Sequence, residues 1–327
     1  MLLVCILVSV LYYYERVQEL NSEYRAIKTQ YEYIYVNHPI QPVPKIKAID
    51  KKQALLGKAL FNSTLLSKDN SVSCASCHQV NLGGDDGFSL STGVDNKLGD
   101  RNSPTVLNSS FSLSQFWDGR ASSLGEQIEG PIHNPVEMST NWMEVIDKLE
   151  ADPYFKKAFA EIGASPIEVI HIKSALVIYE ESLITPDAPI DQYLLGNKSA
   201  LSNKQRTGLT KFISYGCVTC HQGVNIGGNL YQKIGRIKNI ESDLSADLGR
   251  FKVTNKPSDR HVFKVPTLRN VAQTSPYFHD GSVQTLEEAV SIMAKFQLGR
   301  DLTEQDIDEL VALLQSFSAP PIEVGEL

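Results

Sequence analysis

Apolar residues recur at helical spacing along most of the chain, whereas the alternating pattern of strands is scarce. Amphipathic helices are predicted over residues 50–61, 167–183, 202–215 and 307–317. Ser202 with Gln205 forms the sequence pattern of a capping box, and Thr285 with Glu288 forms another just before Ala289–Met293. The hydrophobic pattern therefore predicts a mainly α-helical protein.

The N-terminus is an uncharged, mostly apolar run from Leu2 to Tyr14. It is shorter than the roughly 20 residues of a membrane span. It also lacks the basic start and the small-residue cleavage site of a signal peptide. We predict an uncleaved membrane anchor in residues 1–14, with a cleaved signal as the alternative; either one implies export.

Residues 15–48 are predicted to form a helical stalk followed by a linker. Apolar side chains between Val17 and Ile34 recur at spacings of three and four. That spacing fits a short coiled coil that dimerises the protein, and equally an amphipathic helix packed on its own domain. The stretch HPIQPVP (38–44) then interrupts any helix.

Composition and charge narrow the function. The chain has 327 residues, enough for one large or two ordinary domains, and a net charge of -7, which argues against a nucleic-acid-binding surface. Four of its five cysteines belong to two C-x-x-C-H motifs, and the fifth, Cys5, lies in the apolar N-terminus. No cysteines remain for a disulfide framework, so the motifs indicate cofactor attachment.

The motifs are Cys74/Cys77/His78 and Cys217/Cys220/His221. Two thiols at this spacing can form thioethers to one haem, while the adjacent histidine binds the iron. The alternative is zinc, which takes four Cys or His ligands. Each motif carries its own histidine and its own Gly-rich loop, and 143 residues separate the two. We therefore predict two c-type haems.

The two motifs belong to an internal repeat. CASCHQVNLGG (74–84) matches CVTCHQGVNIGG (217–228), SPTVLN (103–108) matches VPTLRN (265–270), and FWDGRASSLGE (116–126) matches FHDGSVQTLEE (278–288). The order is the same in both halves, which predicts two copies of one fold. The alignment places Trp117 opposite His279.

Few residues could serve as the second protein ligand of each haem iron. Beyond His221 the candidates are His261, His279 and Met293. Met293 ends an amphipathic stretch, and its spacing fits an iron ligand and a core-filling residue equally. Near the first motif, Glu137 stands in the loop HNPVEM, as either a surface carboxylate or an acid-base group beside an open iron.

Several segments together resemble the bacterial di-haem cytochrome c peroxidases. These are RNSPTVLN, QFWDGRASSLGEQ, GPIHNPVEM, FKVPTLRNV and SPYFHDGSVQTLEEAVSIM, within a resemblance that runs from about Ile49 to Ala319. The resemblance implies two cytochrome c-like helical domains that face one another. Residues 49–195 would hold the peroxidatic, low-potential haem on His78, and residues 196–327 the high-potential haem on His221.

The resemblance also implies roles for single residues. Met293 would be the second ligand of the His221 haem, Glu137 the acid-base carboxylate, Gln127 a polar group of the distal pocket and Trp117 an electron conduit between the haems. A calcium ion at the domain interface would bind the Asn102 side chain and the backbone carbonyls of Thr274 and Pro276. His279 would have a structural role.

One position departs from the family pattern. Many members have a histidine at the end of the loop that is SLSTGV here, and that histidine caps the peroxidatic iron until the other haem is reduced. This chain has Val94 instead, and valine cannot bind iron. The departure predicts a His78 haem that is open without reductive activation, unless another residue such as His133 or Met138 caps it.

The implied reaction reduces hydrogen peroxide to water. Electrons would come from a small periplasmic cytochrome or a cupredoxin to the His221 haem, then by way of Trp117 to the His78 haem. The protein would be periplasmic and held at the inner membrane by its N-terminus; a homodimer is common in the family, and the oligomeric state stays open. Two alternatives remain, a MauG-type oxidase of a partner protein, against which Met293 argues, and a non-catalytic electron carrier or sensor.

Overall fold

The computed structural model describes residues 38–45, 49–239, 246–322 and 324. The helices in chain order are α2 (Lys51–Phe61), α3 (Cys74–Cys77), α4 (Leu124–Gln127), α5 (Glu129–His133), α6 (Trp142–Ala151), α7 (Pro153–Glu161), α8 (Val169–Ser182), α9 (Pro189–Leu194), α10 (Asn203–Ser214), α11 (Phe251–Thr254), α12 (Leu286–Gln297) and α13 (Glu304–Gln315). The strands β1 (Tyr231–Lys233) and β2 (Val262–Lys264) pair antiparallel. The prediction of a mainly helical protein is confirmed.

The predicted anchor and the predicted coiled coil lie outside the described residues. Within the described part of the chain, no helix combines the length and the apolar character that a membrane crossing requires. Membrane attachment through residues 1–14 and dimerisation through residues 17–34 therefore stay predictions.

Helices α10 and α12 begin at Ser202 and Thr285, the capping residues that the sequence indicated. The Asp50 carboxylate accepts hydrogen bonds from the backbone of Lys52 and Gln53 at the start of α2. Ser202 and Gln205 form a reciprocal capping box at the start of α10. The sequence analysis missed α6 and α7, although Asn141 caps one and Asp152, followed by a proline, caps the other.

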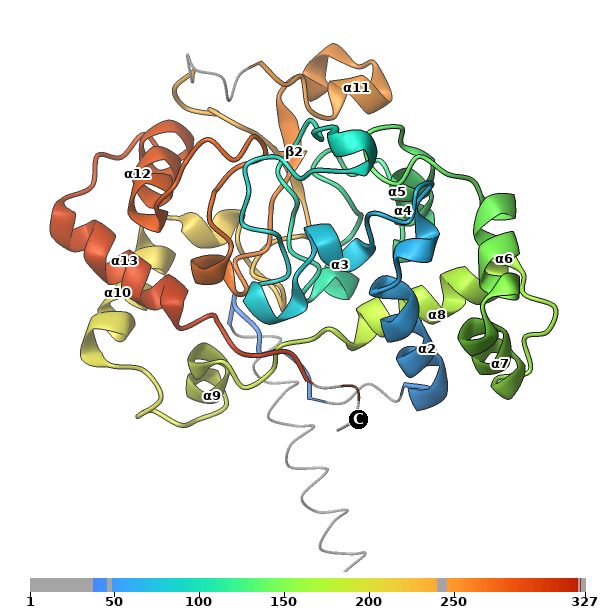
Figure 1. Ribbon diagram of the computed structural model, residues 1–327. Coiled ribbons are helices and arrows are strands. Elements are labelled where there is room, and N and C mark those ends of the chain that lie inside the picture. The colour runs from blue at the N-terminus through green and yellow to red at the C-terminus, as the bar shows by residue number, and fades with distance from the viewer. Residues whose placement is uncertain (1–37, 46–48, 240–245, 323, 325–327) are drawn as a thin grey trace, which may run out of the picture.

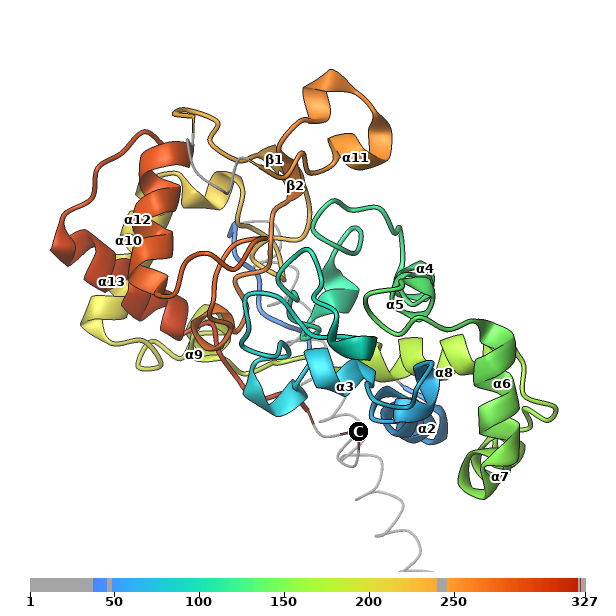
Figure 2. The ribbon, with the colours of Figure 1, turned by 45° about the horizontal axis from the view of Figure 1, so that its top comes forward.

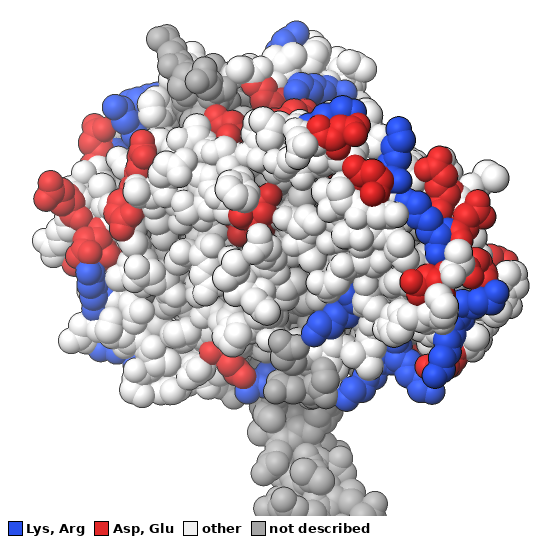
Figure 3. All heavy atoms as spheres, in the orientation of Figure 1, with Lys and Arg blue, Asp and Glu red and all other residues white. Residues whose placement is uncertain are grey.

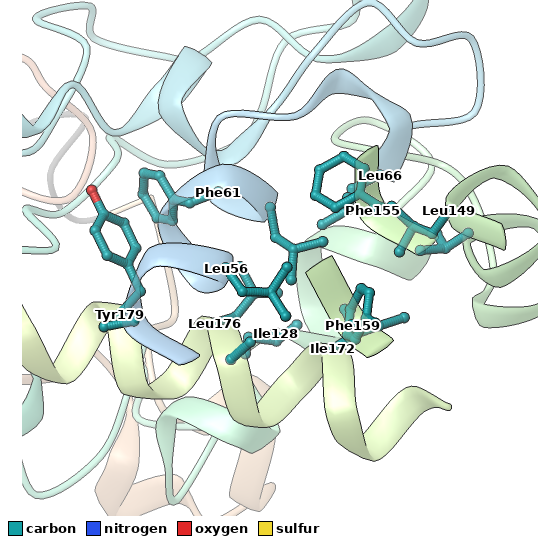
Figure 4. Close-up of a cluster of buried hydrophobic side chains, with 14 of the residues drawn as sticks. Leu56, Phe61, Leu66, Ile128, Leu149, Phe155, Phe159, Ile172, Leu176 and Tyr179 are labelled. Atoms are coloured by element: carbon teal, nitrogen blue, oxygen red, sulfur yellow. The ribbon is translucent and has the colours of Figure 1, made fainter. Parts of the chain in front are cut away.

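A first hydrophobic core forms between α2 and α8 and extends to α6 and α7. Figure 4 shows Leu56 and Phe61 of α2 beside Leu176 and Tyr179 of α8, and the rings of Phe61 and Tyr179 meet edge to face, 5.2 Å apart. The two helices can approach closely because Gly57 has no side chain. A Cβ at this position would collide with the Ala175 carbonyl. This core supports the first C-x-x-C-H motif.

A second core forms mainly between α10 and α13, with contributions from α9 and α12. A Cβ at Gly208 would collide with the Glu309 carbonyl, so a glycine again allows two helices to approach closely. Figures 1 and 2 show the helices of the two cores on opposite sides of the molecule, with long loops and α3 between them. The loops that carry the candidate site therefore lie where the two cores meet.

Matching segments of the sequence repeat adopt matching local conformations. Phe116 and Phe278 both have a positive φ, 66° and 70°. The bridge between Gln115 and Ala121 has its counterpart between Tyr277 and Val283. The repeat therefore extends from the sequence to the backbone.

Two matched asparagines, Asn108 and Asn270, meet between the two cores. Asn108 donates to the hydroxyl of the fully buried Thr185, at 2.8 Å. That hydroxyl donates to the side-chain oxygen of Asn270, at 3.0 Å. Thr185 thus joins corresponding positions of the repeat.

The segment predicted as a linker interrupts the helical pattern, as expected, but it is packed on the protein. Ile40 and Val43 are buried, and the Pro39 carbonyl accepts a hydrogen bond from Gly223 in the loop after the second motif. The Gln41 carbonyl accepts from the buried Arg269, whose guanidinium pairs with Asp191 at 2.7 Å. The chain entering the first core is thus attached to the second.

We expect Asp191→Asn to lower the free energy of unfolding by about 3–5 kcal/mol, because it leaves the Arg269 guanidinium buried without a counter-charge. Denaturant titration of the haem-loaded protein measures the loss. Asp187→Asn is the matched control, since Asp187 makes an exposed ion pair with Lys45 at 2.8 Å, and such pairs contribute little. Equal losses in the two variants would contradict this account.

Candidate functional site

A cavity of about 290 Å³ lies beside the second motif. Cys217, Cys220 and His221 line it, and so does Met293 from the middle of α12. Gly216, with φ of 95°, ends α10 and turns the chain into the motif. The thioether of Met293 and the imidazole of His221 thus line the same cavity. His261 does not line it; its Nδ1 lies 3.0 Å from the Asp247 carbonyl.

The two motif histidines are held in the same way. His221 Nδ1 lies 3.3 Å from the Ile226 carbonyl, and His78 Nδ1 lies 3.2 Å from the Gly84 carbonyl. Each bond leaves Nε2 for another partner. Burial lowers the pKa of both histidines, that of His221 to about 4, so each imidazole is neutral, as a metal ligand must be.

The first motif occupies α3, which begins with a capping box between Ser73 and Ser76. None of the four motif cysteines forms a disulfide bond within the described structure. Burial is the main cause that raises the pKa of Cys74 to about 12, and of Cys77 and Cys217 to about 11. In the described part of the chain, no three His, Cys, Asp or Glu side chains gather as a zinc ion would need. The residues present fit covalently held haems better than zinc.

Glu137 and Val94 lie on two loops that touch near the first motif. The Val94 backbone N–H donates to the Glu137 carbonyl at 2.9 Å. The loops can touch because the residue before Val94 is Gly93. A side chain at Gly93 would collide with the Val136 carbonyl. Val94 is 1% exposed, yet it belongs to neither hydrophobic core.

The environment of the Glu137 carboxyl group changes its pKa. Burial raises its pKa above the usual value, although a hydrogen bond from Asn134 and the charge of Arg120 act in the opposite direction. Asn134 Nδ2 donates to Oε1 at 2.6 Å, which leaves Oε2 available. Burial is the main cause of the raised pKa of Cys74 and Cys77, followed by the charge of Glu180 for Cys74 and of Asp86 for Cys77. The charge of Glu137 adds a smaller contribution in the same direction to both, which agrees with a position near the first motif.

His133 and Met138 were the residues that could cap the iron of the His78 haem in place of the missing histidine. Neither side chain lies free beside the first motif. His133 is held between the Glu129 carboxylate and the Thr140 carbonyl, 3.2 Å from each. Met138 is buried in the first core. Gln127 ends α4, directly before α5 and the loop that carries Glu137.

Trp117 and His279, matched in the repeat, meet in space. Their rings lie 6.3 Å apart, edge to face, and His279 stacks on Phe263 at 4.2 Å. Both line the cavity of the second motif. His279 is buried, and its Nε2 has no hydrogen-bond partner among the described residues.

The structure brings the three predicted calcium-binding residues to one cavity, since Asn102, Thr274 and Pro276 all line it. The Asn102 backbone accepts from the Trp117 indole at 2.9 Å and donates to the His279 carbonyl at 2.8 Å. Its side-chain nitrogen donates to the Phe88 carbonyl at 2.8 Å, so the amide oxygen is the atom left for a cation.

Comparisons with known proteins agree with this geometry. A profile described as di-haem cytochrome c peroxidase matches residues 51–199. The cytochrome c551 peroxidase of Nitrosomonas europaea is 43% identical over 86% of this chain and 84% of its own length. This chain belongs to the di-haem cytochrome c peroxidase family.

Two further likenesses support the membership. The cytochrome c peroxidase Ccp of Escherichia coli is 44% identical over 86% of this chain, which spans 61% of that relative's length. A crystal structure of a MauG-like protein associated with microbial copper homeostasis superposes with a TM-score of 0.71 at 26% identity, covering 86% of this chain and 94% of the other. The family implies two c-type haems and a peroxidase function.

A charged network beside Trp117 and His279 escaped the sequence analysis of this di-haem peroxidase. Arg101 bonds to both Asp118 and Asp247, each at 2.6 Å. Arg101 and Asp118 lie inside the segments RNSPTVLN and FWDGR. Their place in these segments was the only feature of the sequence that pointed to the network. Asp247 lies 146 residues from Arg101 in the chain, so nothing in the sequence indicated the pair.

Proposed function

We propose that this peroxidase reduces hydrogen peroxide to water at the Cys74–His78 site. The observation that carries the proposal is the half-buried Glu137, whose carboxyl group has a raised pKa and whose backbone is hydrogen-bonded to the Val94 loop. When bound, the two haems supply an iron for peroxide and a store for electrons. The residues of the chain hold these groups, exclude water and move protons.

Glu137 performs the acid-base work. With Oε1 fixed by Asn134, Oε2 takes a proton from the bound peroxide and returns it to the departing oxygen, so that water leaves rather than hydroxide. Gln127 supplies a polar group to the charge that develops on the oxygens. A pKa above that of an ordinary carboxylate suits a group that must both accept and release a proton.

The second site receives electrons. His221 and Met293 line the same cavity, which supports an assignment of Met293 as the second ligand, and a thioether ligand raises the reduction potential of a haem. Trp117 and His279 stand between the two sites, with Trp117 as the conduit and His279 in a structural role. A calcium ion held by Asn102, Thr274 and Pro276 stabilises this junction.

We place the two haems in domains that correspond to residues 49–195 and 196–327, formed by duplication. The matched backbone conformations at Phe116 and Phe278, and the two separate cores, support the duplication. The protein works in the periplasm, attached to the inner membrane by residues 1–14, and accepts electrons from a small cytochrome or cupredoxin.

Electron paramagnetic resonance of the air-oxidised protein, followed by peroxide turnover with a reduced monohaem cytochrome, tests this function. We expect a high-spin haem signal, because Val94 leaves the first iron open, and turnover without prior reduction. Two low-spin six-coordinate haems would contradict the open site. Absence of turnover would favour a MauG-type oxidase or an electron carrier.

A further inference from the structure

A group of basic side chains surrounds one exposed apolar residue near the second motif. The group consists of Lys233, Arg236, Lys238, Lys295 and Arg300, all exposed, around Ile237, which is 59% exposed. We name these six residues the basic patch. They come from two segments that are far apart in the sequence: the end of β1 with the chain that follows it, and the end of α12 with the residues after it.

Specific hydrogen bonds join the two segments. The backbone N–H of Ile237 donates to the Phe296 carbonyl at 3.0 Å, and that of Arg236 donates to the Gln297 side chain at 2.8 Å. The same Gln297 side chain donates to the Lys233 carbonyl at 3.0 Å. The patch is therefore a defined surface of the fold rather than a chance meeting of two loops.

Within the described structure, the cations of the patch have no acidic partners. Among the described residues, none of the five forms an ion pair; Arg300 lies over the Tyr215 ring at 4.3 Å and Lys295 over Phe296 at 5.6 Å. Asp301 is the single carboxylate within residues 231–239 and 295–301. Glu241 and Asp243 follow outside the described residues, and the cations still outnumber these carboxylates.

This local charge opposes that of the whole chain, which is -7. Acidic side chains are frequent elsewhere, and Figure 3 shows red groups around the edge of a face whose centre is largely uncharged. A positive surface on an acidic protein selects a negatively charged partner and repels a positively charged one. The positive charge of the patch thus indicates a negatively charged partner, which the net charge of the chain would not suggest.

The patch borders the cavity of the second motif. Arg300 itself lines that cavity, together with Gln232, Ile234, Gln297 and Leu298 from the same two segments. The patch also includes the end of α12, the helix that carries Met293. A protein bound here would lie directly over the rim of the site that receives electrons.

We propose that the basic patch is the docking surface for an acidic electron-donor protein, a small redox protein with carboxylates around its electron-transferring edge. Ile237 supplies the apolar centre and the five cations supply steering and orientation. Electron-transfer complexes are small and transient, so a surface of this size is sufficient. The proposal rests on the proposed function only in taking the Cys217–His221 site as the entry point for electrons.

The test compares two triple charge reversals in the haem-loaded full chain. The patch variant is Arg236→Glu, Lys238→Glu and Lys295→Glu. The control is Lys52→Glu, Lys68→Glu and Lys256→Glu, which changes the net charge equally at three other exposed lysines that form no ion pair within the described structure. Arg300 is left unchanged because it lines the cavity.

Stopped-flow absorbance measures how fast a reduced acidic monohaem cytochrome c reduces each oxidised variant, without peroxide. We expect the patch variant to lose about tenfold or more in second-order rate at low ionic strength, a loss that shrinks as salt is added. The control variant should lose far less. Equal losses in both variants, no loss in either, or faster reduction of the native protein by a basic cytochrome than by the acidic one would overturn the proposal.

Peroxide turnover with hydroquinone, a neutral small reductant, is measured in parallel. It should be the same in all three proteins, because it requires no docking. Since the reduction experiment contains no peroxide, it tests the patch even if the protein has no peroxidase activity. Failure of the docking surface and failure of the proposed function are therefore seen separately.

Discussion

Replacing Glu137 by Gln should lower peroxide turnover by about 10²–10⁴-fold, the usual contribution of a positioned acid-base group. The amide keeps the size of the side chain and its contact with Asn134, but it cannot take a proton from peroxide on Oε2. Haem content, the spectrum of the oxidised protein and its reduction by a donor should stay the same. Steady-state and single-turnover kinetics with peroxide measure the effect.

The pH dependence separates this role from a structural one. Glu137 must be ionised to accept the proton, and burial raises its pKa. Turnover should therefore fall as the pH drops through this raised pKa, and Glu137→Gln should remove that acidic limb. Glu161→Gln, at an exposed carboxylate that ends α7, is the control. Unchanged turnover in Glu137→Gln would favour a non-catalytic carrier.

Replacing Val94 by His should convert an open first site into a capped one. The imidazole would compete with peroxide for the iron, and a cap present in 99% of molecules lowers the apparent affinity for peroxide about 100-fold. The oxidised variant should show a low-spin signal in place of the high-spin one. Prior reduction of the second haem should restore turnover if it releases the cap.

Val94→Leu is the matched control, because it enlarges the same buried side chain without adding a ligand. Its oxidised spectrum should keep the high-spin signal of the native protein. A low-spin signal in Val94→Leu would show that displacement of the loop, rather than ligation, closes the site. Native and Val94→His proteins with identical oxidised spectra would show that position 94 does not face the iron.

Much of the architecture followed from local sequence signals. The capping residues Ser202 and Thr285 marked helix starts correctly, since a cap and the helix it begins are only a few residues apart. The two helices α6 and α7 were missed although Asn141 and Asp152 cap them. Both the caps and the amphipathic spacing of these two helices are present in the sequence, so their existence was predictable and was overlooked.

Other features depend on residues that are far apart in the chain. No local signal indicated that the segment around Ile40 packs against the second core, because proline-rich stretches look alike whether free or bound. The pair of Arg101 with Asp247 and the junction of β1 with the end of α12 are of the same kind. Such contacts exist only once the fold has formed.

The sequence by itself determined the chemistry of this peroxidase, namely two C-x-x-C-H motifs in a repeat, a candidate carboxylate and a missing capping histidine. The two motifs lie within short segments, where spacing alone constrains what can bind, whereas the meaning of the carboxylate and of position 94 comes from the resemblance to the family. The tertiary structure decided which of these segments meet. It placed Met293 on the cavity of His221 and joined the Val94 loop to Glu137. It also raised the pKa of Glu137, because only packing can remove a carboxyl group from water.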